Sequence, residues 1–399
     1  MDILHLLDVL GIGELPQMPS DFWEEQSVHI SVSDTSVIEA LERDLGLLGA
    51  YYEPTLACAK AVAGDRDLCE WSDRIASYIA SHELGEGATL PKPRPVGDAF
   101  AYYYLLIITA LVPSGIALYR ARGFCEEEIR QALCPTVRDR VTVSECFSLE
   151  AGLDRSGFGW LLHYVKAQVF PAGIFNVTPR KLHEASILLR HRQSGSYECL
   201  VLSGRFHRSG VQLGSGGCTD GEGAFDANFV ETEDAFIGCP VSSYARLSPE
   251  RRTYPKSEWQ EIVRQGGAIA GIHIPRGASL THENIKEGFA NAFRISRKRY
   301  PEADVRAVHC SSWILDTQLE NLLGESSRVV GFGKHFLRYP QGGDGAAVYS
   351  FVFNQKRPAD LSELKEDTSL QRKIKSLYLN GGCIYITGGF VPDDTLTVF

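Results

Sequence analysis

The sequence lacks a surplus of basic residues. Its 399 residues include 40 Lys and Arg against 50 Asp and Glu, which gives a formal net charge of −10. Binding to the phosphates of a nucleic acid or an anionic membrane needs concentrated Lys and Arg. We therefore expect neither as a partner, although a local basic site for one small anion is compatible with this charge. The hydrophobic fraction of 44% and charged fraction of 23% are typical of a soluble globular protein and exclude extensive disorder or coiled coil.

The ten cysteines form no recognisable metal or disulfide pattern. No two of them make a C-x-x-C motif and none pairs with His at zinc-finger spacing, so we expect no metal site. Disulfide frameworks are typical of small secreted chains. The first residues, Met1–His5, also lack a basic region followed by an apolar run and a cleavage site. We predict a cytoplasmic protein with reduced thiols, most of them buried.

One stretch contains no charged residue. Residues 99–119 are long enough to span a bilayer, but Pro113-Ser114-Gly115 interrupts them and the chain has no second stretch of this kind. We predict two buried helices that meet at this break.

The length and a change of pattern predict two domains. A chain near 400 residues is long for one core. Before about residue 165 the spacing of apolar residues is helical, with a capped helix start at Ser33–Ser36. After about residue 170 short apolar runs alternate with Gly, Pro, Ser and Asp, and residues 187–192 and 197–202 look like a hairpin. The predicted domains are a mostly helical one over 1–165 and a mixed α/β one over 166–399.

The stretch from Ser257 to Val330 is the most informative. Residues 258–263 look like a helix that ends at Gly266-Gly267. Apolar residues 268–275 predict a buried strand, Thr281 caps a helix over 282–299, and residues 305–315 predict a second strand. Strand, helix and strand at this spacing form a βαβ unit, so the two strands are expected to be parallel.

A βαβ unit binds its ligand at the carboxyl ends of its strands and the amino end of its helix. His273 ends the first strand, and the turn that follows can hold a pyrophosphate or carboxylate through Arg276, Gly277, Ala278, Ser279 and Thr281. In the second strand, alternation places His309, Ser311 and Trp313 on one face and Cys310 and Ser312 on the other. The alternative is that these side chains are structural: a satisfied histidine, a surface arginine, and hydroxyls bonded to nearby backbone.

Two long strings carry a family resemblance, Gly266–Gly277 and Cys310–Asp316. Shorter stretches agree with it in order: Tyr119–Gly123, the segment at Trp160-Leu161, and the tail over 364–372. The sequence resembles bacterial acyltransferases that join an N-acyltransferase-type helical N-terminal domain to a GNAT-like C-terminal domain. The resemblance implies an α/β (α+β) chain whose C-terminal domain is a mixed β-sheet flanked by helices.

The resemblance also implies an activity. GNAT enzymes hold the pantetheine of a coenzyme A thioester between two splayed strands, and an amine attacks the thioester directly. We accordingly expect an acyl-coenzyme A, or an acyl carrier protein, as donor and an amine of a small molecule or peptide as acceptor. On the matching positions His273 is the candidate base, the turn Arg276–Thr281 the pyrophosphate cradle, and Ser311 or Ser312 the proton donor.

Two alternatives stay open. Cys310 could be a nucleophile with His273 or His309 as its base, so that transfer passes through an acyl-enzyme. The chain could also be a non-catalytic ligand-binding or regulatory protein on the same fold. Two departures from the family pattern favour the latter: the turn lacks the R/Q-x-x-G-x-G/A string, and the helix at Gln318–Asn321 lacks the tyrosine that often serves as acid.

Overall fold

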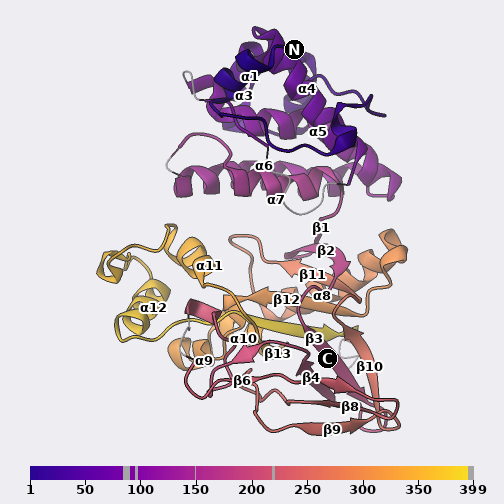
Figure 1. Cartoon of the computed structure of the whole chain (residues 1–399), viewed down its shortest axis with the longest axis vertical. Coiled ribbons are helices and arrows are strands. Elements are labelled where there is room, and N and C mark those ends of the chain that lie inside the picture. The colour runs from indigo at the N-terminus through magenta and orange to yellow at the C-terminus, as the bar shows by residue number, and fades with distance from the viewer. Residues whose placement is uncertain (84–89, 95–97, 149, 218–220, 394–399) are drawn as a thin grey trace. The chain divides into compact units, whose positions relative to one another are not determined.

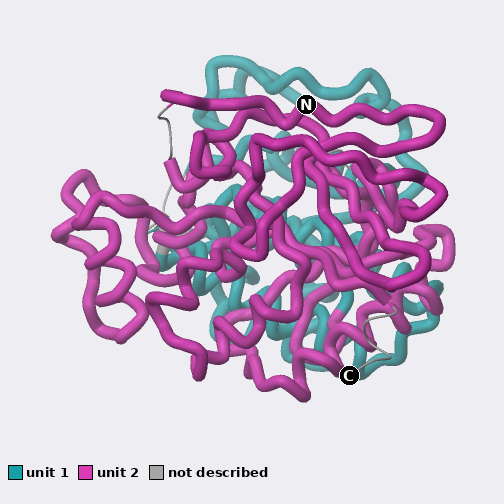
Figure 2. Tube along the Cα trace, turned by 90° about the horizontal axis from the view of Figure 1, so that it is seen from below, with its two compact units in different colours: residues 1–170 teal, residues 171–399 magenta. Residues whose placement is uncertain are grey.

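The computed structural model of the chain describes residues 1–83, 90–94, 98–148, 150–217 and 221–393. The chain divides between Phe170 and Pro171 into two compact units, 1–170 and 171–399 (Figure 2); the sequence predicts this boundary after residue 165. Nine cysteines carry free thiols, and Cys218 lies outside the described residues. Within the ranges above, no three His, Cys, Asp or Glu side chains gather as metal ligands.

Unit 1 is helical, as predicted. The capped start that the sequence indicates is the beginning of α2, where the Asp34 carboxylate accepts a hydrogen bond from the backbone N–H of Ser36. Gly46, at φ +62°, ends the same helix in the left-handed conformation. The helices of unit 1 are α1 (Ile3–Leu10), α2 (Thr35–Leu45), α3 (Tyr52–Ala63), α4 (Arg66–Ser81), α5 (Tyr103–Ala121), α6 (Glu126–Ser148) and α7 (Arg155–Val165).

The uncharged stretch forms one helix, so the prediction of two helices meeting at Pro113 is wrong. α5 runs through Pro113 without a break. An internal proline costs a helix about 3 kcal/mol, but the side chains over 103–112 are all buried within unit 1, and this packing outweighs the cost. Gly115 allows a close approach, because a Cβ there would lie 2.7 Å from the carbonyl oxygen of Val165. Residues 99–121 are long and apolar enough to cross a membrane, and 61% of the apolar window is buried, as in a core helix.

Unit 2 is built around a six-stranded mixed sheet in the order β1-β2-β11-β12-β14-β13 (Figure 1). A second sheet, β10-β3-β4, packs on one face of it, and β7-β8-β9 and β5-β6 are smaller additions. The strands are β1 (Phe170–Ala172), β2 (Phe175–Lys181), β3 (Ser186–His191), β4 (Tyr197–Val201), β5 (Arg205–Phe206), β6 (Phe225–Asp226), β7 (Val230–Glu231), β8 (Ala235–Gly238), β9 (Arg252–Pro255), β10 (Trp259–Arg264), β11 (Ala268–His273), β12 (Ala307–Ser312), β13 (Leu337–Pro340) and β14 (Thr387–Pro392). The helices are α8 (His282–Arg299), α9 (Gln318–Leu323), α10 (Arg328–Gly333), α11 (Ala346–Val348) and α12 (Ser369–Leu379).

The helix predicted over 258–263 is wrong, because these residues form strand β10. β10 pairs antiparallel with β3, which belongs to the predicted hairpin with β4. Val263 is buried in the core between the two larger sheets, and Trp259 packs edge-on against Tyr254. Trp, Ile and Val fit a half-buried strand, so the ladder with β3 prevails over the helical spacing. Gly266, at φ +85°, forms the turn into β11 instead of a helix cap.

The predicted βαβ unit is confirmed as β11, α8 and β12, with the two strands parallel. Thr281 caps α8 as expected, accepting a hydrogen bond of 3.3 Å from the N–H of Asn284. The second strand is shorter than predicted. β12 ends at Ser312, whose hydroxyl accepts from the N–H of Ile314, and Trp313–Leu315 form a 3-10 turn. Trp313 therefore does not share a strand face with His309 and Ser311.

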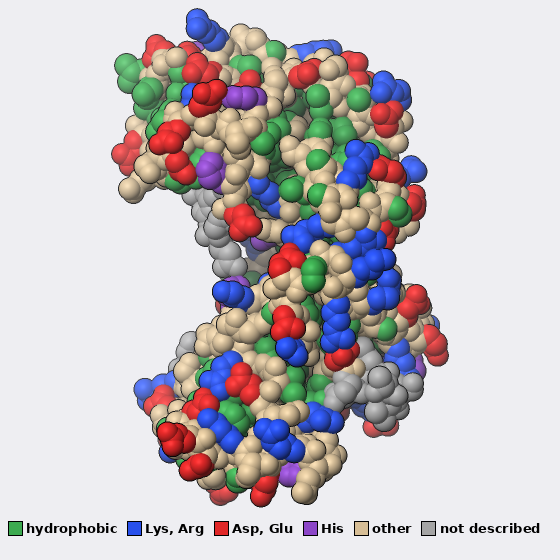
Figure 3. All heavy atoms as spheres, turned by 90° about the vertical axis from the view of Figure 1, so that its right-hand side faces the viewer, with side chains coloured by type: hydrophobic (Ala, Val, Ile, Leu, Met, Phe, Trp, Pro, Cys, Tyr) green, Lys and Arg blue, Asp and Glu red, His purple; other side chains and the backbone are tan. Residues whose placement is uncertain are grey.

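The six-stranded sheet lies between two layers. On one face the sheet β10-β3-β4 contributes Leu188, Cys199 and Val263 to a core shared with Ile269 and Phe390. On the other face α8 packs Phe289 against Phe175 of β2, with ring centroids 5.3 Å apart. The surface drawn in Figure 3 carries acidic, basic and apolar side chains interspersed.

Candidate functional site

The two parallel strands of the βαβ unit separate where they carry their polar residues. Their ladder comprises the pairs Ala270–Val308 and Gly271–His309. Beyond these pairs β11 continues along β2, and β12 continues along β14. From there on, the facing edges of β11 and β12 carry backbone N–H and C=O groups that take no part in the ladder between these two strands. Such groups need partners when buried, and a ligand with amide groups can supply them.

The register of the sheet sorts the candidate residues onto two faces. His273 and Gly271 share a face of β11, and Gly271 is paired with His309. On that face the His309 Nε2 atom lies 2.9 Å from the hydroxyl of Tyr339, and the Ser311 hydroxyl donates a 2.7 Å hydrogen bond to Oε1 of Gln341. The structure therefore brings His273, His309 and Ser311 to one face, as the alternation predicts for His309 and Ser311.

Cys310 and Ser312 lie on the opposite face of β12, which α8 covers. Burial raises the pKa of the Cys310 thiol to about 12, so the thiol is protonated at neutral pH. A nucleophilic cysteine needs an accessible thiolate and a base beside it. The structure does not bring Cys310 together with His273 or His309, the bases that a covalent mechanism would use. Ser312 is engaged in capping the turn that follows β12.

The turn before α8 is open to solvent. Gly277 takes φ +79°, and a Cβ built on it would meet nothing within 4 Å. Arg276 donates a 2.9 Å hydrogen bond to the side-chain oxygen of Asn354, which fixes its guanidinium near the turn. Ala278 and Ser279 lead into Thr281, the N-cap. The amino end of an 18-residue helix with an arginine beside it can bind a phosphate or carboxylate.

Further positive charge surrounds this helix end. His282, in the first turn of α8, stacks on His335 with ring centroids 5.2 Å apart. Burial lowers the pKa of His335, and the charges of His282 and Lys286 lower it further. Lys286, whose charge disfavours a charged His335, favours an anion. Glu283 opposes it from the first turn, so the site depends on Arg276, Lys286 and the helix amides.

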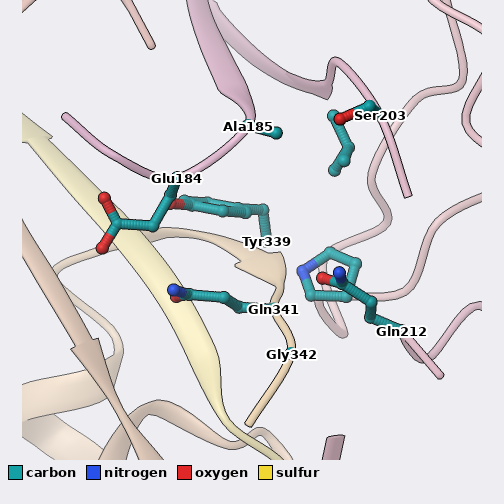
Figure 4. A pocket seen from close by; sticks show the side chains of 9 residues that line it. Glu184, Ala185, Ser203, Gln212, Tyr339, Gln341 and Gly342 are labelled. Atoms are coloured by element: carbon teal, nitrogen blue, oxygen red, sulfur yellow. The ribbon is translucent and has the colours of Figure 1, made fainter. Parts of the chain in front are cut away.

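The sequence pattern does not identify three functional candidates, Glu184, Tyr339 and Gln341. They line a cavity of about 230 Å³ together with Ala185, Val201, Ser203, Gln212, Pro340 and Gly342 (Figure 4). Tyr339 supplies a phenol from β13, whereas the family pattern places a tyrosine in the helix that follows β12. β13 lies two strands from β12 in the sheet, and no pattern along the chain displays this order.

The titratable groups beside this cavity are Glu184 and His309, and Arg180 lies next to them. Burial lowers the pKa of His309 to about 4, so its ring is neutral at pH 7. Burial by itself raises the pKa of the Glu184 carboxyl. The interactions with His309 and with the Arg180 guanidinium lower this pKa by more, so the net pKa lies below its usual value. With His309 neutral, the cation that keeps Glu184 ionised is Arg180, 3.2 Å away.

Arg180 also lies at the point where the strands separate. A Cβ on Gly271 would come 2.9 Å from the Arg180 Nε atom, so the arginine side chain crosses β11 there because residue 271 is glycine. Its guanidinium donates to the Lys181 carbonyl at 2.8 Å and to the Glu184 carboxylate. The Arg180 guanidinium is therefore a fixed cation at the point where β11 and β12 begin to separate.

The buried His309 predicts that the folded protein is less stable in acid. The pKa of His309 falls from 6.5 to about 4 on folding. Between these two pH values His309 is therefore protonated in the unfolded chain and neutral in the native protein. Stability is then highest above pH 6.5 and falls as pH drops towards 4, by up to about 3 kcal/mol from this group.

Chemical denaturation of wild-type protein and H309Q at pH 7.5, 5.5 and 4.5 measures this effect. Glutamine keeps a polar side chain for Tyr339 but cannot titrate, so H309Q should show a flatter dependence on pH. Equal slopes for the two proteins would contradict the assignment. Any loss of stability in acid that remains in H309Q is expected from Glu184, because its lowered pKa also destabilises the native protein as pH falls below about 4.5.

Comparisons with known proteins agree with this architecture. Residues 218–391 match the GNAT-like C-terminal domain family. Solved structures of an acyltransferase with decanoyl-CoA and teicoplanin, and of an acyltransferase mutant with octanoyl-CoA, each match at a TM-score of 0.63 and 17% identity, over 98% of this chain and 99% of theirs. An acyltransferase with CoA and 10C-teicoplanin matches at 0.63 and 16% identity, with the same coverage. A comparison with curated proteins found no match.

At such low identity these likenesses show the fold. They extend over both units, whereas the family match covers part of the second. The predicted combination of a helical N-terminal region with a mixed sheet and its flanking helices is confirmed. Residues 218–391 are thus similar to the GNAT-like C-terminal domain family, and the fold of the chain is similar to that of these solved acyltransferases over 98% of its length.

Proposed function

We propose that the protein is an acyltransferase that moves an acyl group from a coenzyme A thioester to an amine of a small molecule or peptide. The observation that carries the proposal is the early end of the β11–β12 ladder, after Gly271 and His309, next to the amino end of α8. This arrangement offers strand edges for pantetheine amides and a cationic turn for phosphates. The similar acyltransferases were solved with CoA, decanoyl-CoA and octanoyl-CoA, which supports the same class of donor here.

The residues present fit such a donor. Arg276, Lys286 and the first amides of α8 would hold its phosphates, and the separated strands would hold its pantetheine. The turn Pro275–Thr281 is exposed or half-buried and has no bulky side chain at Gly277 and Ala278. An acyl carrier protein presents the same pantetheine arm, so it is a second candidate donor that uses the strand edges alone.

Transfer needs three events at the strand ends. The ammonium of the acceptor loses a proton, and its nitrogen then attacks the thioester carbon. A C–N bond forms as the C–S bond breaks, and the departing thiolate takes up a proton. We assign the first proton transfer to His273, and the last to Ser311, which lies on the same face of the sheet. Tyr339 stays protonated, because burial raises its pKa well above 10, and it fixes His309.

The experiment is a donor and acceptor screen with purified protein. Thermal shift with acetyl-, octanoyl- and decanoyl-CoA tests the donor, and release of free thiol with a panel of primary amines tests the acceptor. We expect stabilisation by at least one acyl-CoA and amine-dependent thiol release, with the N-acyl product seen by mass spectrometry. Absence of both binding and turnover would overturn the proposal, and binding without turnover would indicate a ligand-binding protein. An acyl adduct on Cys310 would indicate covalent transfer instead of direct attack.

The phosphate cradle gives a separate prediction. We expect R276A to raise KM for acyl-CoA about tenfold, because one charge-assisted hydrogen bond to phosphate is lost. The KM of an N-acetylcysteamine thioester, which lacks the pyrophosphate, should not change. Equal effects on both donors would mean that Arg276 acts on the fold and not on the phosphates. R299A, at the opposite end of α8, serves as the matched control.

A further inference from the structure

The cavity beside the sheet is made by four segments of unit 2, one of which contributes Gln212 from the connection between β5 and β6. Glu184 and Ala185 lie between β2 and β3, Val201 and Ser203 follow from β4, and residues 339–342 end β13. Figure 4 shows that the Glu184 carboxylate, the Tyr339 hydroxyl and the Gln341 amide lie towards one end, while Ser203 and Gln212 lie towards the other. One end of the cavity thus carries a carboxylate, a phenol and an amide, and the other end carries a hydroxyl and an amide.

The end with Glu184 is joined directly to the separated strands. Tyr339 is hydrogen-bonded to His309, and Gln341 accepts a hydrogen bond from Ser311. His309 is the last residue of β12 in the ladder with β11, and Ser311 lies two residues beyond it. Two lining side chains are therefore in contact with the stretch of β12 that borders the opening. This end of the cavity therefore borders the opening in which the proposed function places the thioester.

The lining of the cavity contains one acidic side chain and no basic one. Among the lining residues Glu184 is the one with an ionisable carboxyl group or a basic side chain, and its carboxylate is ionised at neutral pH. The other polar side chains offer hydroxyls and amides, which can accept hydrogen bonds from an ammonium group or its neighbours. The Arg180 guanidinium balances Glu184 from outside the lining. An anion would find no compensating charge within the lining.

Buried polar atoms point to an occupant. The Nδ1 atom of His309 and the hydroxyl of Thr178 are shielded from solvent and have no hydrogen-bond partner among the residues that the structure describes. His309 is fully buried, and both residues lie beside Gly271 in the register of the sheet. Unpaired buried polar atoms are costly and rare in native structures. Both atoms flank the place where β11 and β12 separate, next to the cavity but not in its lining, so they indicate polar groups or water in the opening between the strands.

We propose that this cavity binds the amine-bearing end of the acceptor as its ammonium ion, with Glu184 as the residue that holds the charge. The acceptor class is a primary amine whose nitrogen is attached to a compact, polar group, since the cavity measures about 230 Å³ and ends at Ser203 and Gln212. This inference rests on the proposed function and adds the acceptor site to it. Glu184 is a specificity-determining residue in this scheme, and His273 remains the base.

The test compares E184Q with wild-type protein and with E198Q. Glu198 is a half-buried carboxylate of β4, and its strand partner Leu189 packs in a different apolar cluster from the one beside the cavity. In E184Q we expect KM for the amine to rise about 10- to 100-fold, because an ion pair is lost and Arg180 is left unbalanced beside the cavity. KM for acyl-CoA should stay within about twofold, and E198Q should match wild type in both constants.

A second measurement does not depend on turnover. The N,N-dimethyl derivative of the best amine keeps the positive charge, and we expect it to inhibit competitively against the amine. Its inhibition constant should weaken as pH rises through the pKa of the compound, and should weaken in E184Q by the same factor as KM. The analogue with a hydroxyl in place of the amine should bind wild type and E184Q equally.

The outcomes separate the two proposals. If wild-type protein transfers acyl groups and E184Q resembles E198Q, the acceptor site is elsewhere and the proposed function stands. Tighter inhibition above the pKa of the dimethyl compound would likewise overturn the inference, because it would show that the neutral amine binds. If wild-type protein neither binds acyl-CoA nor acylates an amine, the proposed function fails, and this inference fails with it. Should E184Q not fold, the pH dependence of inhibition in wild-type protein decides.

Discussion

Replacing His273 by alanine is expected to lower kcat for acyl transfer by about 10²- to 10⁴-fold, the usual contribution of a general base. His273 is half-buried at the end of β11, on the same face as His309 and Ser311 and beyond the point where the strands separate. A base there lies next to the path of an amine that attacks a thioester between the strands. KM for acyl-CoA should change little, because the phosphates are held by the turn that follows.

The measurement is the initial rate of thiol release from acyl-CoA with the amine panel, over pH 6 to 9. H273A should show the lower kcat at every pH of this range, while KM for acyl-CoA stays close to that of wild-type protein. H29A is the control, because His29 is an exposed histidine of unit 1. If H273A keeps more than half of the wild-type rate, the base is another group, and the His309–Tyr339 pair is the next to examine.

The placement of this histidine could be predicted from the sequence, because it depends on local signals. The apolar run over 268–275 and the threonine at 281 fix a strand and a helix start within 15 residues, and parallel pairing follows from the connection. The alternation in β12 likewise places His309 and Ser311 on one face. The prediction failed at residues 258–263, where a helical spacing of apolar side chains competes with a ladder to β3 that the sequence does not display.

The rest of the site depends on contacts between distant segments. Tyr339 reaches His309 because β14 lies between β12 and β13, so that residues 30 apart in sequence meet. Glu184 reaches the same place from the connection between β2 and β3. No motif marks either residue, since a lone glutamate or tyrosine near a strand is common in any sheet protein. Strand order is set by the whole sheet, and a pattern read along the chain cannot supply it.

Gly388 is the residue on which this long-range geometry depends most, and G388A is expected to disturb it. Gly388 of β14 is paired with both Ser311 and Tyr339. A Cβ at this position would come 2.6 Å from the Tyr339 hydroxyl oxygen and from its Cε1 atom. The tyrosine has little room to move, because its ring is buried and stacks on Phe390 with centroids 5.4 Å apart.

We expect G388A to lose about 1–3 kcal/mol in free energy of unfolding, as overpacking of a filled core usually costs. The displaced Tyr339 should also release its hydrogen bond to His309, which leaves a buried imidazole unpaired on both nitrogens and adds about 1–3 kcal/mol. Denaturant titration at pH 7.5 measures the sum. G331A is the matched control, because a Cβ on Gly331 in α10 meets nothing within 4 Å and alanine favours a helix.

The same variant separates a structural role of Tyr339 from a role in the acceptor site. If Tyr339 only fills the core, G388A should lose stability while the folded fraction keeps its KM for the amine. If Tyr339 shapes the cavity beside Glu184, KM for the amine should rise in G388A while KM for acyl-CoA stays constant, as in E184Q. A G388A protein within 0.5 kcal/mol of wild type would show that the tyrosine shifts without cost. The His309–Tyr339 contact would then be adjustable, and the polar end of the cavity would not have the fixed geometry that recognition of a compact ammonium group requires.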